Sequence, residues 1–430
     1  MKSTHRKLPL LQSPSGVATS IKAIILAAAF SATLVFAEQG PPRDAFFAPV
    51  IPETEGLESD QLYPQGTTFP ISFFSLGGKK GVRGGPNEEL TESERQEWFE
   101  RYKADGFTAI GPQYARNRTI LEEAAALDLR AIYSISGGWS KNDLRGVDRE
   151  RIRAAIRARV EDALAREHAD RIDWWYLKPE ELRYWREHEI EYLEAAADTI
   201  RETDPRDRPV WMYGPGHRNA SALRHTARHL DIVGKGMYTN YSGQVEDRVW
   251  TRWSIEQQNE AIEQANPGAI SIAVPEMFRH PGEFVEALAE DEDKALATIP
   301  RWVRHDVYSA LVAGAKGVVI FSLRERPVAE GRDDLPFTGA VHEAYYQAYA
   351  GIAKELTGDL GLGQVFLFGE RRDDVAVEIL NGPRTVELSY RDNPTEDYPA
   401  VSLANIAYGE ARYLIAVNET PEPIRAMIPD

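Results

Sequence analysis

The 430-residue sequence contains no cysteine. This excludes disulfide bonds, thiolate metal ligands, a cysteine nucleophile and a lipid anchor on cysteine. The sequence also has no apolar run of the roughly 20 residues that a membrane-spanning helix needs. Basic residues are in deficit, with 50 Lys and Arg against 67 Asp and Glu and a formal net charge of −17. That balance argues against nucleic acid and anionic membranes as partners.

The one sustained apolar run, Ala23–Ala37, lies near the N-terminus. It follows the basic residues Lys2, Arg6, Lys7 and Lys22 and ends in small residues. This arrangement is typical of a secretory signal peptide. We therefore expect cleavage after residue 37, a periplasmic or secreted product and no stable membrane association. An uncleaved N-terminal anchor is the alternative.

After a lead-in at residues 38–66, rich in Pro, Gly and Glu, apolar strand-like stretches alternate with helical patterns. The eight strand candidates are Phe69–Leu76, Phe107–Gln113, Arg130–Ile135, Trp174–Leu177, Pro209–Tyr213, Ile232–Tyr238, Ala269–Val274 and Gly317–Leu323. Eight β-α units predict a (β/α)8 TIM barrel over residues 67–357. A doubly wound open sheet is the alternative, but GGKKGVRGG at residues 77–85 does not match its phosphate-binding loop, and we expect no cofactor.

From Gly363 onward the apolar pattern changes to period two, in VFLFG, DVAVEIL, RTVELSY and ARYLIAVN. Such alternation is typical of strands with one buried face. We expect a small antiparallel β domain over residues 358–430. The helix predicted at Val341–Leu356 leaves little linker, so this domain should dock on the barrel.

Catalytic groups of a TIM barrel lie at the carboxyl ends of its strands. The candidates there, in chain order, are Gln113, Trp139, Lys178, Glu180, Glu181, His217, Arg218, Tyr238, Glu276, Arg279 and Arg324. Strands four and seven both end in Pro-Glu, in LKPEE (177–181) and AVPEM (273–277). These strands oppose each other in a barrel, and glycoside hydrolysis needs two facing carboxyl groups.

On these motifs the chain resembles the large clan of retaining (β/α)8 glycoside hydrolases, whose acid/base Glu ends strand four and whose nucleophile Glu ends strand seven. The resemblance implies that Glu180 is the acid/base, Glu276 the nucleophile and Tyr238 its hydrogen-bonding tyrosine. It departs from the clan at Pro179, where Asn is usual, and at residues 321–323, which lack the usual Trp. The choice between Glu180 and Glu181 therefore stays open, and so does the family.

Other interpretations remain. Glu276 could cap the following segment, and Glu180 could simply begin a helix. An inverting hydrolase, or a polysaccharide lyase with Tyr238 or His217 as base, would use the same residues. A non-catalytic carbohydrate-binding barrel is the rival outside enzymes. The pair His225 and His229 lacks the glutamate of an HExxH motif, so no metal site is predicted. The oligomeric state is left open.

Cationic residues are frequent at the predicted mouth although the whole chain is acidic. They include Lys178, Arg218, Arg279 and Arg324. Because the Arg fork binds two oxygens of a carboxylate or sulfate at once, the substrate is predicted to be an anionic glycan, uronic or sulfated. The alternative is that these cations pair with neighbouring acids.

Overall fold

The structure is a computed structural model, and it describes most of the chain after residue 63. The described residues are 64, 66–74, 91–112, 119–245, 248–277, 282–323, 339–391 and 393–428, together with the backbone of short strands at 21–23, 79–80 and 88–89. Apart from the backbone of residues 21–23, the predicted signal peptide lies outside this set, and so does most of the lead-in.

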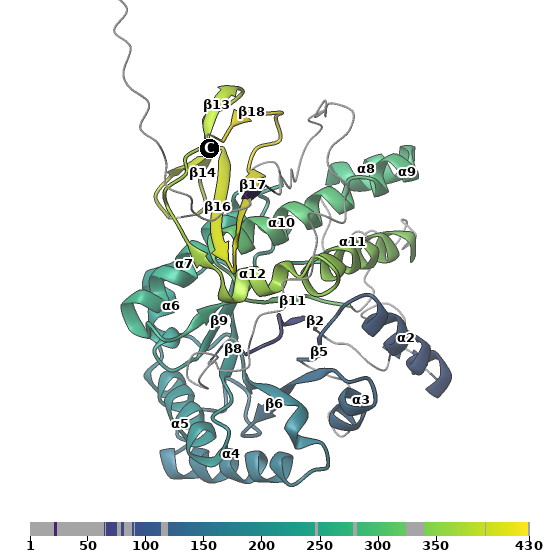
Figure 1. Ribbon diagram of the computed structural model, residues 1–430. Helices are drawn as coiled ribbons and strands as arrows, with labels where there is room; N and C mark the ends of the chain where they lie inside the picture. The colour runs from purple at the N-terminus through teal and green to yellow at the C-terminus, as the bar shows by residue number, and fades with distance from the viewer. Residues whose placement is uncertain are drawn as a thin grey trace, which may run out of the picture.

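The centre of the fold is a curled parallel sheet (Figure 1). Its strands are β2 Ile71–Phe73, β5 Ala109–Ile110, β6 Arg130–Ser136, β7 Ile172–Lys178, β8 Val210–Gly214, β9 Ile232–Lys235, β10 Ile270–Ser271 and β11 Val318–Ile320. Six of them form one sheet in the order β10-β9-β8-β7-β6-β5, and β11 pairs with β2. All eight regions coincide with predicted strands, although the hydrogen-bonded ladders are mostly shorter.

Both edges of the six-stranded sheet are linked to the β11–β2 pair. On one side the Thr108 amide donates to the Ile71 carbonyl at 3.2 Å. On the other side isolated parallel bridges join Ala273 to Val318 and Glu276 to Phe321. The six-stranded sheet therefore curls until its two edges meet the same strand pair.

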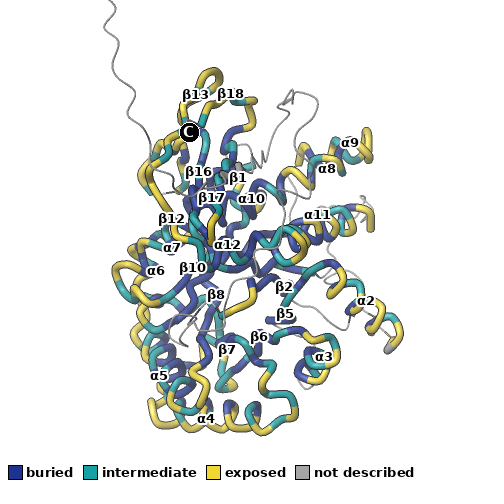
Figure 2. Tube along the Cα trace, viewed as in Figure 1, coloured by how far each residue is buried: buried dark blue, intermediate teal, exposed yellow. Residues whose placement is uncertain are grey.

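One apolar cluster fills the inside of this curl. It takes a residue from each of the eight strand regions, and its aromatic members come mainly from strands β7 and β8. The members are Phe74, Ala109, Ile132, Trp174, Tyr176, Trp211, Tyr213, Ile232, Ile270, Ile272, Val274 and Val319, with Tyr238 and Phe321 packed against them. Side chains of a parallel strand alternate between faces, so the opposite face packs on the surrounding helices. Figure 2 shows the buried strands enclosed by helices with exposed outer faces.

Helices follow the strands as amphipathic periodicity predicts. They are α2 Glu92–Ala104, α3 Ile120–Ala126, α4 Arg149–Leu164, α5 Glu187–Thr203, α6 Ala220–Ala227, α7 Trp250–Ala265, α8 Gly282–Glu290, α9 Glu292–Leu296, α10 Ile299–Ala313 and α11 Gly339–Thr357. The short helices α8 and α9 precede α10 and were not predicted. In the described part of the chain, no helix combines the length and apolarity needed to cross a bilayer.

The predicted first strand of the C-terminal domain is wrong. Residues Leu362–Phe368 form helix α12, not a strand at VFLFG. Three consecutive side chains, Val365, Phe366 and Leu367, are all buried, because α11 covers the helix on one side and the C-terminal sheet on another. In so short a run, a pattern that fits a strand with one buried face also fits a helix that is covered on both sides.

The strands after α12 form antiparallel sheets, as expected. They are β12 Glu370–Arg371, β13 Glu378–Asn381, β14 Thr385–Leu388, β15 Glu396–Pro399, β16 Val401–Tyr408, β17 Ala411–Asn418 and β18 Arg425–Met427, and we call them the C-terminal β region. Strand β1, Ile21–Ala23, pairs in parallel with β17 at the edge of the order β1-β17-β16-β12. Two antiparallel two-stranded pairs, β13 with β18 and β14 with β15, complete the region. Elsewhere β3 Lys79–Lys80 pairs with β4 Glu88–Glu89.

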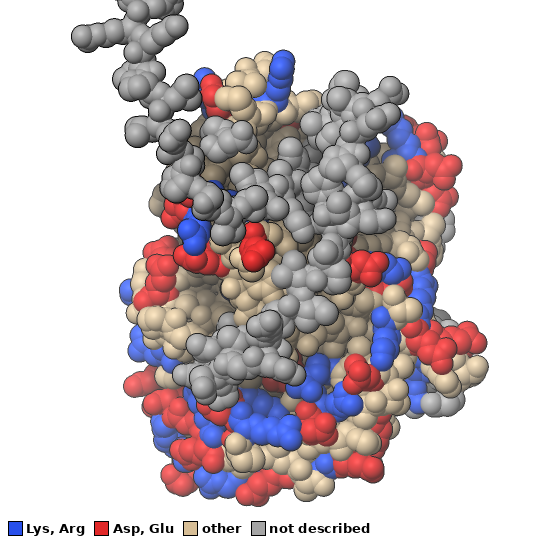
Figure 3. Space-filling view, viewed as in Figure 1, with Lys and Arg blue, Asp and Glu red and all other residues tan. Residues whose placement is uncertain are grey.

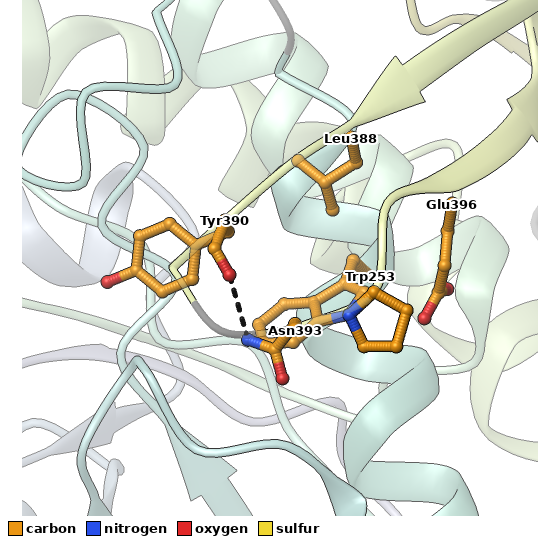
Figure 4. Close-up of a pocket in the computed structure, with 6 residues that line it drawn as sticks. Trp253, Leu388, Tyr390, Asn393 and Glu396 are labelled. Carbon is orange, nitrogen blue, oxygen red and sulfur yellow. Dashed lines mark hydrogen bonds between the residues drawn. The ribbon is translucent and has the colours of Figure 1, made fainter.

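The C-terminal β region contacts the parallel-sheet part through helices α7 and α10. Trp250 and Trp253 of α7 pack against Val386, Leu388 and Tyr398 in one apolar cluster. A small surface pocket lies at this contact, between Trp253 and the β14–β15 pair (Figure 4). None of the predicted site residues lines this pocket, so we place the candidate site elsewhere, at the strand ends.

Candidate active site

Glu180 lies two residues beyond the end of β7, and it reaches back over the inside of the curled sheet. The hydroxyl of Tyr176 donates a hydrogen bond to its Oε2 atom. Tyr176 belongs to the interior cluster and is fully buried, whereas Glu180 is half-buried. The carboxyl group therefore sits directly above the aromatic layer that fills the sheet, where a ligand entering from the strand ends would meet it.

Glu181 faces a different way from Glu180. Its backbone is left-handed, with φ of 57°, and its amide donates to the Tyr213 carbonyl at 3.0 Å. Its carboxylate accepts from Lys141 Nζ at 3.2 Å, and 41% of the side chain is exposed. This geometry supports Glu180, not Glu181, as the acid over the aromatic layer.

Glu276 follows strand β10 and is 3% exposed. Its carboxyl group accepts from the Asn240 amide and lies 3.3 and 3.4 Å from the Tyr241 amide, both in the segment that follows β9. Burial raises the pKa of Glu276 to about 8, although these amides and Arg248 pull it down. A carboxyl group whose ionised form accepts two backbone hydrogen bonds is held in one orientation.

A buried tyrosine cluster connects the two candidate carboxyl groups. Tyr213 and Tyr238 stack with ring centroids 6.2 Å apart and share a hydrogen bond. Tyr176 belongs to the same cluster because the ring of Phe74 contacts both Tyr176 and Tyr213. Burial raises the pKa of Tyr213, and the negative charges of Glu181 and Glu180 raise it further. Burial likewise raises the pKa of Tyr238, with Glu276 among the smaller contributors. Glu180 and Glu276 therefore border the same aromatic cluster from strands four and seven.

Behind Glu276 lies a buried ion pair that sequence reasoning missed. Arg248 donates two hydrogen bonds to Asp306 of α10, from Nε at 2.9 Å and from Nη2. Its third nitrogen, Nη1, donates to the Asn240 side chain at 3.0 Å. Burial tends to raise the pKa of Asp306, but Arg248 and His305 outweigh it and hold the pKa below its usual value. The sequence signal was His305-Asp306, a polar pair within the apolar helix α10.

Four further predicted residues border the strand ends in different roles. Trp139 is half-buried against the main core, with an edge contact to Tyr192 at 6.3 Å. The hydroxyl of Tyr192 also donates to the Lys178 carbonyl at 2.5 Å. Arg218 is buried, donates to the Leu182 carbonyl at 2.6 Å and lies over the Tyr184 ring. His217 is exposed.

Two arginines act on His217. Desolvation on its inner side lowers the pKa of His217 although the residue as a whole is exposed, and Arg391 and Arg218 lower it further. Lys235 also lies nearby, but complete burial holds its own pKa well below the ordinary value. Arg391 comes from the C-terminal β region, so the cations converge from two parts of the chain. A further cation pairs with an acid, since Arg183 binds the buried Glu189 at 2.5 Å. On the face shown in Figure 3, basic and acidic side chains lie next to each other.

Gln113, Arg279 and Arg324 lie outside the described residues. Within the described ranges, no three His, Asp or Glu side chains gather in a way that could hold a metal ion.

Comparison with known proteins gives only distant structural likeness. No family model matches the chain, and no curated protein matches it. Among solved structures, a β-glucuronidase of an uncultured Clostridium sp. has 14% identity and a TM-score of 0.42, over 66% of this chain and 51% of that one. The β-glucuronidase of Ruminococcus gnavus has 10% identity and a TM-score of 0.42, over 66% of this chain and 50% of the other.

A GH2 β-galacturonidase from Eisenbergiella tayi has 14% identity and a TM-score of 0.43, over 64% of this chain and 50% of that one. The chain thus spans about half the length of the glycoside hydrolase structures it matches.

Proposed function

We propose that this chain is an exported glycoside hydrolase that uses Glu180 and Glu276 at the mouth of a closed (β/α)8 barrel. The observation that carries the proposal is that both carboxyl groups, placed by strands four and seven, border one buried tyrosine cluster. Barrel closure is supported by the hydrogen bonds that tie both sheet edges to the β11–β2 pair. Catalytic residues of barrel enzymes occupy this end of the strands.

In the proposed retaining mechanism, Glu276 attacks the anomeric carbon while Glu180 gives its proton to the departing glycosidic oxygen. The carbon–oxygen bond of the glycoside breaks, and an ester bond to Glu276 forms. Glu180 then takes a proton from water, whose oxygen attacks the same carbon and releases Glu276 as a carboxylate. The Asn240 and Tyr241 amides hold the Glu276 carboxylate in place for both steps.

The two-carboxyl mechanism predicts a bell-shaped pH profile, because one carboxyl group must be ionised while the other is protonated. The Glu276 pKa of about 8 places one limb of the kcat/KM profile near pH 8, whichever of the two groups carries the proton. Measuring kcat/KM from pH 5 to 9.5 on one substrate tests for this limb, and a profile without it would count against a role for Glu276.

An anionic sugar is the proposed substrate class. The support is the pair of arginines near His217, Arg391 and Arg218, which both act on its pKa. A positive potential at the end of strand five would attract a carboxylate or sulfate on the bound sugar.

The test is hydrolysis of a panel of 4-nitrophenyl glycosides, with neutral hexosides beside β-glucuronide and β-galacturonide, and of polysaccharides. Polysaccharide products are assayed both as new reducing ends and as ultraviolet-absorbing unsaturated sugars. Reducing ends without ultraviolet absorption support hydrolysis, and unsaturated products indicate a lyase. Binding of oligosaccharides without turnover would instead support a carbohydrate-binding barrel.

Three variants separate the carboxyl groups. Glu180→Gln and Glu276→Gln should each lower kcat by 10³-fold or more, because each removes one partner of the pair. Glu181→Gln is the matched control, since its carboxylate pairs with Lys141, and it should retain most of the activity. Equal loss in Glu181→Gln and Glu180→Gln would refute the choice of Glu180.

A further inference from the structure

A chain of polar contacts leads from Glu276 out of the parallel-sheet part and into the C-terminal β region. We call it the polar chain, and its members are Glu276, Asn240, Arg248, Asp306, His305 and Glu419. Arg248 is 3.0 Å from the Asn240 side chain and 2.9 Å from Asp306. His305 then faces Asp306 through Nδ1 at 3.1 Å and Glu419 through Nε2 at 3.0 Å. The first link is the hydrogen bond from the Asn240 amide to Glu276.

Every member of the polar chain is buried. Exposure is 3% for Glu276, 8% for Asn240, 3% for Arg248, 4% for Asp306, 7% for His305 and 1% for Glu419. The links from Glu276 to His305 are hydrogen bonds, which are strong where water is excluded, and each one restricts the orientation of the next. The last link, from His305 to Glu419, is an ion pair. Glu419 is also held on its far side, by the hydroxyls of Ser309 and Ser402.

The charges along the polar chain alternate in sign. Burial alone would lower the pKa of His305, but its contacts with Asp306 and Glu419 raise it to about 9. The charged groups that face His305 are Asp306 from its own helix and Glu419 from the C-terminal β region, with Arg248 beyond Asp306. His305 is therefore a cation at neutral pH, held between two carboxylates.

We propose that Glu419, which follows β17 in the C-terminal β region, is a positioning residue for Glu276 and acts through the polar chain. The proposal rests on the proposed role of Glu276 in catalysis. It makes the C-terminal β region a structural part of the active site.

The geometry shows how Glu419 would act. Asp306 receives hydrogen bonds from Arg248, His305 and Thr239, so its orientation depends on all three donors. Asp306 in turn directs the Arg248 fork so that Nη1 meets the side chain of Asn240. The backbone of that same Asn240 donates to Glu276. Removing the charge of Glu419 releases His305, which then no longer fixes Asp306.

The test compares Glu419→Gln with Arg371→Gln. The glutamine keeps the size of Glu419 and an oxygen for Ser309 and Ser402, but it lacks the charge that His305 needs. Arg371 is the matched control, because it also ties the C-terminal β region to α10, by donating to the Leu311 and Val312 carbonyls at 2.6 Å. Neither of these two hydrogen bonds of Arg371 involves a member of the polar chain.

On the substrate that the wild type cleaves best, Glu419→Gln should lower kcat tenfold or more and change KM by less than threefold. The limb of its kcat/KM profile that reports the Glu276 pKa should lie at a higher pH than in the wild type. The reason is that a neutral His305 leaves Asp306 less compensated, and the charge of Asp306 opposes ionisation of Glu276. Arg371→Gln should lower Tm but keep kcat and the pH profile. A Glu419→Gln variant with wild-type kcat and pH profile would overturn the proposal.

A second measurement does not depend on activity. The stability of each protein is compared with that of its own Glu276→Gln version, so that changes in the titration of His305 cancel. In the wild type this difference should grow as pH rises from 4.5 and level off near pH 8, because only the unfolded chain ionises Glu276 in that range. In the Glu419→Gln background the levelling-off should move to higher pH, whereas Arg371→Gln should leave it in place. An unmoved levelling-off overturns the inference whether or not any glycoside is cleaved. A moved levelling-off in a protein that cleaves none of the panel would refute the proposed function alone.

Discussion

The substitution Glu276→Gln should change how the stability of the protein depends on pH. The ordinary pKa of a glutamate is 4.5, and burial raises that of Glu276 to about 8 in the folded protein. Between these values the folded protein keeps the proton while the unfolded chain has lost it. The stability contributed by this proton is complete below pH 4.5 and is lost as pH rises toward 8.

The size of the effect follows from the displacement of the pKa. At 1.36 kcal/mol per pKa unit, the displacement from 4.5 to about 8 corresponds to a loss of roughly 5 kcal/mol in the free energy of unfolding. His305, whose pKa is raised from 6.5 to about 9, adds a loss of the same sign as pH rises from 6.5 to 9. Because His305 is present in both proteins, the difference between wild type and Glu276→Gln isolates Glu276.

The assay is urea unfolding followed by tryptophan fluorescence, from pH 5 to 8.5. The variant should gain several kcal/mol relative to the wild type across this range, so the two curves of unfolding free energy against pH diverge. Glu202→Gln is the control. Arg153 lowers the pKa of Glu202, so its contribution is already complete above pH 5 and its curve should run parallel to that of the wild type. Wild-type and Glu276→Gln curves that stay parallel within about 0.5 kcal/mol would refute the burial argument.

Three further predictions follow from the same contacts. Tyr176→Phe removes the hydroxyl that donates to Glu180, and we expect a tenfold or greater fall in kcat with a stability loss of about 1 kcal/mol, measured by steady-state kinetics and urea unfolding; unchanged kcat would mean that the bond does not orient the acid. Arg248→Gln leaves Asp306 buried without its bidentate partner and should cost about 3–5 kcal/mol, whereas the exposed-site control Arg149→Gln should cost less than about 1 kcal/mol by the same assay. N-terminal sequencing of protein exported by a bacterial host should read from Glu38, and such cleavage would remove β1 and leave β17 at the sheet edge; retention of residues 1–37 would contradict the export proposal.

The local pattern of apolar residues in the sequence was sufficient to predict most of the helices and the eight strand regions. The helix predicted at Val341–Leu356 is α11, whose observed bounds are Gly339–Thr357. Such periodicity depends on neighbouring residues, because one face of the helix must be apolar wherever the chain packs. The helix α12 shows the limit. Its run VFLF is too short for the spacing of apolar residues to distinguish a strand from a helix. The helix forms because of the elements that cover it.

For the candidate site, the sequence alone determined the residue types and their place at the ends of strands four and seven. Glu180, Glu276 and Tyr238 could be selected because the Pro-Glu pairs and the strand order are local features. Only the tertiary structure decided that Glu180 meets Tyr176 while Glu181 turns to Lys141, since one left-handed residue separates their directions. Only the tertiary structure, too, joined Arg248, His305 and Glu419, which lie on a loop, on a helix and just after strand β17, far apart in sequence. Their pairing has no sequence period, because buried charges select partners by proximity in the folded chain and not by spacing along it.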